Sequence, residues 1–63
     1  MYIKTQTNQT QLIHSLIVNE FHFSFTILKT KLIPNHTITN KQIELITKLL
    51  NRNYLNTTFK IIK

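Results

Sequence analysis

The chain has 63 residues, with eight Lys and Arg against two acidic residues, and its formal net charge is +6. A single domain of this size has a marginal core, because folding buries only about 60% of the surface that its unfolded chain exposes. The absence of Cys excludes disulfides and thiolate metal sites, so we expect a partner to supply additional stability.

The excess of positive charge predicts an anionic partner. A positive field over a small surface attracts polyanions, and nucleic acid is the commonest of them. Solubility alone is the plainer interpretation of the same charge. No apolar run approaches the ~18 residues of a membrane helix, and the first residues lack the features of a signal peptide or a transit peptide. We therefore expect a nucleic acid as the partner and no membrane.

The composition is unusual in one respect. Gly, Ala and Asp are absent, Val occurs once and Glu twice, although four of these five residues are ordinarily among the commonest. All five are encoded by codons that begin with G, so the gene is expected on an AT-rich strand, as in organelle genomes and some reduced genomes. The mitochondrial matrix is the favoured location, with synthesis there or import by another route, and the plastid stroma or a bacterial cytoplasm is the alternative.

The first nine residues, MYIKTQTNQ, are polar after Ile3 and rich in Thr and Gln. They either extend a strand or form a loose arm. We assign residues 1–9 as an N-terminal arm and residues 10–63 as a single small domain, because no internal repeat or low-complexity segment divides the chain further.

The segment TQLIHSLIVNEFHFSFTILKTKL, residues 10–32, fits two periodicities. A strand would place on one side the alternating residues Phe21, Phe23, Phe25 and Ile27. A helix would place on one stripe Phe21, Phe25, Leu28 and Leu32. Periodicity leaves both interpretations open, and the richness in aromatic and β-branched residues favours a strand.

The second half of the chain has a clearer pattern. Thr39 followed three residues later by Gln42 is typical of a capping box, which satisfies two otherwise free backbone groups. A helix over residues 40–53 follows from the helical spacing of Ile43, Ile46, Leu49 and Leu50. Before it, HTIT is a short β-branched segment, and after it Phe59 and Ile61 alternate with polar residues as in a strand. The mixture predicts an α+β fold.

Catalytic and metal-binding groups are scarce. Glu20 and Glu44 lie in different segments and offer no carboxylate pair for acid–base chemistry, and a chain without Gly has no Gly-rich phosphate loop. His14, His22 and His36 lack the further ligands that zinc needs, so we interpret them as surface residues. We expect no enzyme activity, no metal, no cofactor and no small-molecule substrate.

Short motifs between Thr10 and Ile62 follow one another in a familiar order. The first is SLIV at 15–18, and Thr26-Ile27 follows eleven residues past its Ser. Further along stand His36-Thr37-Ile38, Glu44-Leu45-Ile46 and Phe59-Lys60-Ile61. This series resembles the bacterial type of the ribosomal large-subunit protein thirty family, with its motif glycines replaced by Val18, Lys31 and Glu44.

The resemblance implies a small three-stranded antiparallel sheet with two helices packed on one face. It makes residues 12–15 a strand, residues 22–32 a helix and the segment around His36 a middle strand. The implied core sets helix residues Phe25, Leu28, Leu32, Ile43, Ile46 and Leu50 against strand residues Leu12, Ile38, Phe59 and Ile61.

The resemblance also implies a function: a structural constituent of a large ribosomal subunit that holds ribosomal RNA and contacts neighbouring ribosomal proteins. Phosphate contacts by Lys and Arg give such binding a salt-dependent affinity. The candidate RNA-binding residues lie at the turn after the first implied strand and along the same side, and they are His14, Ser15, Asn19, Lys29, Lys31, His36 and Lys41.

Three alternatives stay open. The residues KLIP and KQIELIT resemble part of ribosomal small-subunit protein eighteen, although the arginine cluster of that protein is missing. A protein–protein accessory subunit of an organelle complex, or a viral factor, would use the apolar surplus at an interface. A DNA-binding helix pair is disfavoured, because Glu44 and the scarcity of Arg suit the 40–53 helix poorly for contacts with base edges.

Overall fold

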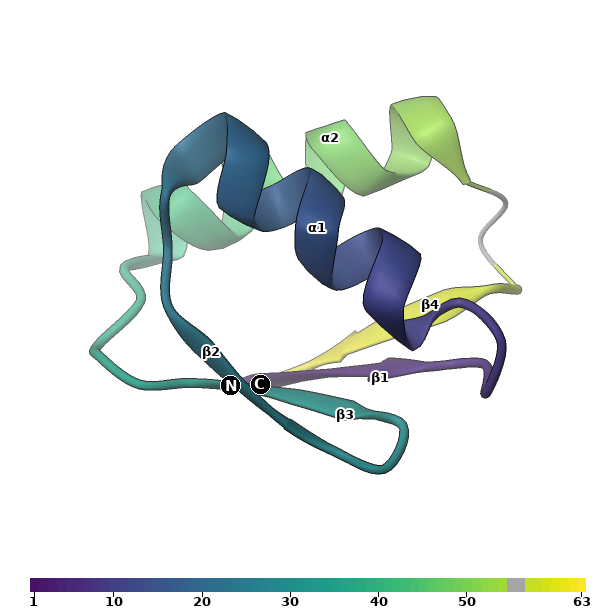
Figure 1. The fold of residues 1–63 in the computed structure, drawn as a ribbon. Helices are drawn as coiled ribbons and strands as arrows, with labels where there is room; N and C mark the ends of the chain where they lie inside the picture. Colours follow the sequence, from purple (N-terminus) through teal and green to yellow (C-terminus); the bar gives the residue numbers. More distant parts are fainter. Residues whose placement is uncertain (55–56) are drawn as a thin grey trace.

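The computed structural model describes residues 1–54 and 57–63. The described elements are β1 (Tyr2–Thr5), α1 (Thr10–Phe21), β2 (Phe25–Leu28), β3 (Lys31–Pro34), α2 (Asn40–Asn53) and β4 (Phe59–Ile62). The strands form one antiparallel sheet in the order β2-β3-β1-β4, and both helices cover the same face of it (Figure 1). This α+β arrangement is the β-α-β-β-α-β, split βαβ motif.

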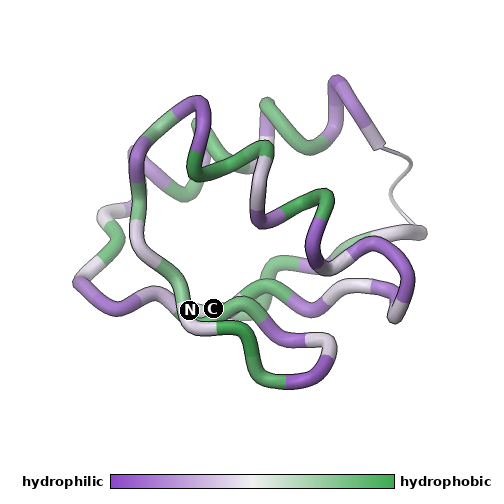
Figure 2. Tube along the Cα trace, in the orientation of Figure 1, coloured by the Kyte–Doolittle hydropathy of each residue, from purple (hydrophilic) through white to green (hydrophobic). Residues whose placement is uncertain are grey.

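The core lies between the sheet and the two helices, where the apolar segments of the chain face one another (Figure 2). The central strands and both helices each contribute to it. The fully buried side chains are Ile3, Ile13, Ile17, Leu32, Ile46 and Leu50. Neither described helix has the length and apolar character needed to cross a membrane.

Residues 2–5 lie in the middle of the sheet rather than in a loose arm. β1 pairs with β3 on one edge and with β4 on the other, and both pairings are antiparallel. Ile3 is fully buried and Thr5 is 6% exposed, so alternate residues of β1 enter the core. The expected three-stranded sheet is therefore wrong: the described sheet has four strands, because β1 belongs to it and residues 25–34 contribute two more.

Residues 12–15 form part of helix α1, and the implied strand there is wrong. Ile13 and Ile17 are one helical turn apart and both fully buried, whereas Leu12 is 57% exposed. A strand would turn Ile13 and Ile17 to the same side as well, but it could not bring the partly buried Leu16 against that core. A helical stripe buries all three, so tertiary packing decides in favour of the helix.

Residues 25–34 form the β2–β3 hairpin, and the implied helix over residues 22–32 is wrong. Phe25 pairs with Pro34 and Leu28 with Lys31, which leaves a two-residue turn. The richness in aromatic and β-branched residues favours a strand over residues 21–27, which is correct for residues 25–27 only, since Phe21 ends α1. Because side chains alternate along β2, Phe25 is buried and Leu28 is 55% exposed, so Leu28 does not join the core.

The other implied core positions have a mixed outcome. Burial is confirmed for Phe25, Leu32, Ile43, Ile46 and Leu50. Ile38, Phe59 and Ile61 are partly buried and pack against the core. The implied middle strand around His36 is wrong, since that segment is a loop between β3 and α2.

Helix α2 has the predicted bounds and the predicted cap. The Thr39 hydroxyl accepts a hydrogen bond from the Gln42 backbone N–H at 3.2 Å, and the Gln42 side-chain oxygen accepts one from the Thr39 N–H at 2.9 Å. This reciprocal pair is the capping box. The strand predicted around Phe59 and Ile61 is also confirmed, as β4.

Within residues 1–54 and 57–63, two side-chain-bearing residues adopt the left-handed backbone conformation that usually belongs to Gly. His22 has φ 59° and ends α1, with its N–H donating to the Val18 carbonyl at 2.8 Å. Lys29 has φ 57° in the β2–β3 turn. A residue with a Cβ is strained in this region, and no Gly is available in this chain to relieve the strain.

Replacing His22 by Gly should therefore raise the free energy of unfolding by about 1 kcal/mol, because Gly removes the Cβ clash at an exposed helix end. Urea denaturation followed by circular dichroism measures the change. His22→Ala is the matched control, since it keeps the Cβ and should give no such gain. Equal effects of the two substitutions would contradict the strain explanation.

Candidate nucleic-acid interface

The sheet has one face turned away from the helices, which we call the open face. In β1, Ile3 is fully buried against the helices, so its neighbours Tyr2 and Lys4 are on the open face. The same alternation operates around Leu32 in β3. The open face thus consists of the strand residues that alternate with the core-facing residues.

Three lysines lie side by side on the open face, and we call them the lysine row: Lys31, Lys4 and Lys60. Lys4 is directly opposite Lys31 on β3 and directly opposite Lys60 on β4. Since neighbouring strands are about 4.8 Å apart, the backbone positions of the row span about 10 Å. Lys29, in the β2–β3 turn, lines a surface hollow together with Lys4 and Lys31 and so extends the row at one end.

The lysine row has no acidic neighbour on the sheet. Both acidic residues of the chain lie in helices, Glu20 in α1 and Glu44 in α2, on the other side of the sheet. Like charges directly opposite each other destabilise a strand pair. The positive charge of the row is therefore not balanced by acidic residues of the sheet. A bound anion would reduce the repulsion between the lysines.

A second line of residues borders the lysine row, and we call it the apolar row: Tyr2, Ile33 and Ile62. Each is one position along its strand from a core-facing residue, and Tyr2 pairs with Ile62. Ile33 is 36% exposed, and Tyr2 and Ile62 are half-buried. The Lys31 ammonium lies over the Tyr2 ring, 5.1 Å from its centroid. The open face thus places an aromatic ring beside positive charge.

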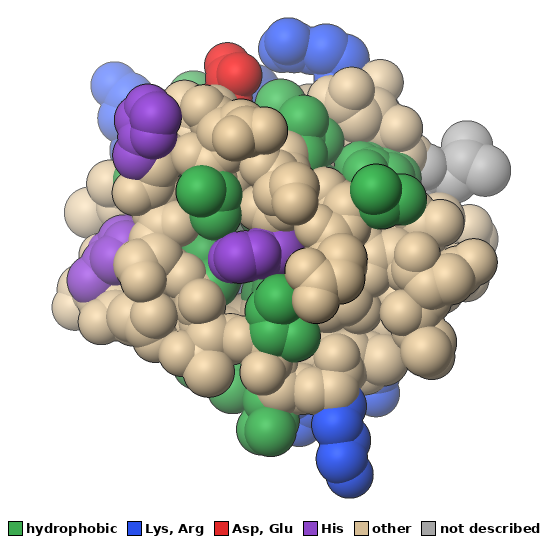
Figure 3. Space-filling model, in the orientation of Figure 1, with side chains coloured by type: hydrophobic (Ala, Val, Ile, Leu, Met, Phe, Trp, Pro, Cys, Tyr) green, Lys and Arg blue, Asp and Glu red, His purple; other side chains and the backbone are tan. Residues whose placement is uncertain are grey.

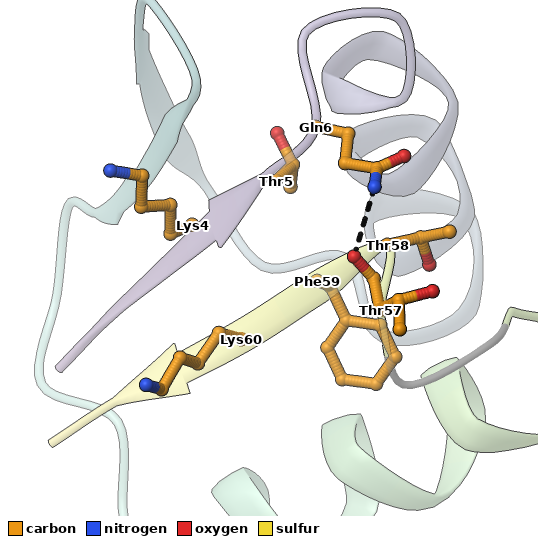
Figure 4. A pocket seen from close by; sticks show the side chains of 7 residues that line it. All are labelled: Lys4, Thr5, Gln6, Thr57, Thr58, Phe59 and Lys60. Atoms are coloured by element: carbon orange, nitrogen blue, oxygen red, sulfur yellow. Dashed lines mark hydrogen bonds between the residues drawn. The ribbon is translucent and has the colours of Figure 1, made fainter.

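The end of the β1–β4 pair is hollowed at the surface (Figure 4). Lys4 and Lys60 extend in the same direction from neighbouring strands at this hollow, and the Gln6 side-chain amide donates to the Thr57 carbonyl at 3.1 Å (Figure 4). Thr58 and Phe59 also line it. The hollow therefore combines two lysine side chains with amide and hydroxyl groups. All of these groups can donate hydrogen bonds to phosphate oxygens.

The residues predicted to bind RNA do not form one group. His14, Ser15 and Asn19 lie on α1, not at a turn after a strand, and the His14 ring packs edge-on against Phe25 with centroids 6.3 Å apart. Figure 3 shows the α1 side of the molecule, where uncharged, apolar and histidine side chains dominate and the basic side chains lie at the margins. These three residues are therefore on the opposite layer from the lysine row.

The remaining predicted residues divide between two places. Lys29 and Lys31 are together, in and directly after the β2–β3 turn. His36 is in the loop after β3, with its ring edge-on to Phe23 at 5.6 Å, and Lys41 is in the first turn of α2. In the described residues, His, Cys, Asp and Glu form no group of three that could hold a metal ion.

The sequence interpretation missed Tyr2, Lys4 and Lys60. A signal for the lysines exists in the segments IKT, TKL and FKI, where a lysine follows or precedes an apolar residue that the structure places in the core. Only the register of β1 with β3 and β4 shows that the three lysines share one line.

Comparisons with known proteins add no relative: no protein-family model, no curated protein and no solved structure matches this chain. The chemistry of the open face is therefore the basis for a functional assignment.

Replacing Lys4 by Glu should raise the free energy of unfolding by about 1 kcal/mol at low salt, because a carboxylate between Lys31 and Lys60 converts two repulsive pairs into attractive ones. Thermal or urea denaturation at low salt and at about 0.5 M salt measures the effect, which should shrink as screening increases. Lys4→Gln, which removes repulsion without adding attraction, should give a smaller gain. A stability loss with Lys4→Glu at low salt would contradict the described register.

Proposed function

We propose that this protein binds RNA through its open face and acts as a structural component of an RNA–protein assembly. The lysine row is the observation that carries the proposal: three lysines stand directly opposite one another on neighbouring strands, without an acidic residue on the sheet. Lys–phosphate contacts supply most of the sequence-independent affinity of proteins for nucleic acid. A polyanion can neutralise the whole row at once, which a single small anion cannot do.

The charge of the open face argues against a second copy of the chain as its occupant. Two such faces in contact would bring two lysine rows together in an environment of lowered dielectric, where like charges repel more strongly. An anionic membrane surface is the other polyanionic candidate. The hydroxyl and amide groups around Gln6 and Thr57 favour discrete phosphates, which accept directed hydrogen bonds.

A ribosome, organellar and most simply mitochondrial, is the assembly we propose as the setting. The small size, the net charge of +6 and the scarcity of residues encoded by codons that begin with G support this setting. The order of elements does not support the large-subunit resemblance, because α1 stands where that family has its first strand and the β2–β3 hairpin where it has its first helix. The proposal therefore depends on charge and composition.

The central test compares two triple variants that lower the net charge equally. Lys4→Gln/Lys31→Gln/Lys60→Gln removes the lysine row, and Lys41→Gln/Lys48→Gln/Arg52→Gln removes three exposed charges from α2. The first variant should lose most of the affinity for a labelled RNA. Its slope of log affinity against log salt should flatten by about 2, since each lost phosphate contact contributes about 0.7 on single strands. The α2 variant should keep most of both.

Fluorescence anisotropy over a salt series measures both quantities, and circular dichroism checks that each variant is folded. Equal losses in the two variants would mean that net charge alone binds RNA and would refute a site on the open face. Binding of the wild-type protein to phosphatidylserine vesicles without binding to RNA would replace RNA by a membrane surface as the partner.

The ribosomal setting has a separate test. An epitope-tagged protein expressed in its native host should sediment with one ribosomal subunit and stay bound after a high-salt wash, because structural ribosomal proteins have many contacts with RNA. Sucrose-gradient sedimentation followed by immunoblotting measures this. Sedimentation in an assembly free of ribosomal RNA would reject the ribosome as the setting.

A further inference from the structure

The ring of Tyr2 has an unusual place on the open face. Tyr2 is on the central strand β1, opposite Ile62 of β4, and its side chain is partly exposed. Its ring lies in the apolar row and borders the lysine row. The Lys31 ammonium covers the ring at 5.1 Å from the centroid, so the ring turns a face, and not only an edge, toward the lysine row.

This arrangement of charge beside a flat apolar surface matches one form of RNA. In a double helix the base faces are stacked inside, so proteins contact its backbone and its shape. A single strand offers its phosphates on one side and unpaired base faces on the other, and aromatic rings stack on such bases. The lysine row and the apolar row present these two kinds of contact in parallel lines.

We propose, on the basis of the proposed function, that the open face selects single-stranded RNA and that Tyr2 stacks against one base. A phosphate at the lysine row attracts the Lys31 ammonium away from the Tyr2 ring. A base then takes the place of the ammonium on the ring face, with Ile33 and Ile62 at its sides. The cation–π contact that is given up joins two partly exposed side chains, where such contacts are weaker than in a desolvated site.

The other aromatic cluster of the surface is less suited to this role. Phe21 and Phe23 stack on each other with centroids 5.2 Å apart, and His36 meets Phe23 edge-on. Each of the two rings thus has one face covered by the other, and both residues also pack against the core. The cluster also lies apart from the lysine row, at the junction of α1, β2 and the loop after β3. Phe23 therefore supplies a matched control for Tyr2.

The test uses the intrinsic fluorescence of the protein. The chain has two Tyr and no Trp, so the Tyr54→Phe variant leaves Tyr2 as its only strong fluorophore. Three probes are compared: a short oligouridylate, the same ribose–phosphate strand without bases, and an RNA duplex. The oligouridylate should quench Tyr2 and bind at least about fivefold more tightly than the abasic strand. The abasic strand should bind without quenching.

Substitutions then separate stacking from charge. Tyr2→Leu should abolish the preference for the oligouridylate over the abasic strand, whereas Tyr2→Phe and Phe23→Leu should retain it. Melting curves of each variant confirm that the sheet is intact, and the duplex affinity of Tyr2→Leu serves as an internal reference that should not change.

Two outcomes would overturn the inference, and they are distinguishable. Equal affinity for all three probes without quenching, together with weaker binding by the variant that lacks the lysine row, would reject single-strand selection and leave the proposed function intact. Absence of binding to every probe would reject both.

Discussion

The pairing of β1 on both of its edges is the constraint on which the rest of the structure depends. The register that sets Ile3 opposite Leu32 and Ile61 also sets Lys4 opposite Lys31 and Lys60. Successive side chains of a strand point to opposite faces, so a slip of one residue would bury lysines and expose isoleucines. Core packing and surface charge are therefore two results of a single register.

The register has two opposite effects on the stability of the sheet. Burial of the apolar residues holds the three strands together, and the repulsion within the lysine row acts against that pairing. A ligand that binds only the folded state stabilises it by an amount that grows with the logarithm of the ligand concentration relative to its dissociation constant. A polyanion on the open face would both relieve the repulsion and add this stabilisation to a chain that has no Cys and hence no disulfides.

The sequence predicted those elements whose signals are local. The bounds of α2 follow from helical spacing and from the capping box at Thr39 and Gln42, which are contained in one short segment. Residues 10–32 could not be assigned in this way, because their short apolar runs fit both periodicities. What separates α1 from β2 is the sheet, because α1 packs on its face and β2 is one of its strands. Strands β1 and β4 of that sheet come from the two ends of the sequence.

The candidate site was partly predictable for the same reason. Lys29 and Lys31 flank one turn and were among the predicted residues, whereas Lys4 and Lys60 join them only through the strand register. Tyr2 escaped notice because its segment was assigned as an arm. The composition correctly suggested a positive surface but carried no information on where the charges gather.

The assembly of the lysine row also depends on the order in which the strands pair during folding. Its members come from the start, the middle and the end of the sequence, and the β2–β3 hairpin is the one strand pair that closes a short loop. Joining β1 to β4 closes the longest loop of the sheet, and non-local pairings of this kind form slowly. The row is therefore complete only after β4 has docked, so a partly folded chain would lack the surface that distinguishes the native protein.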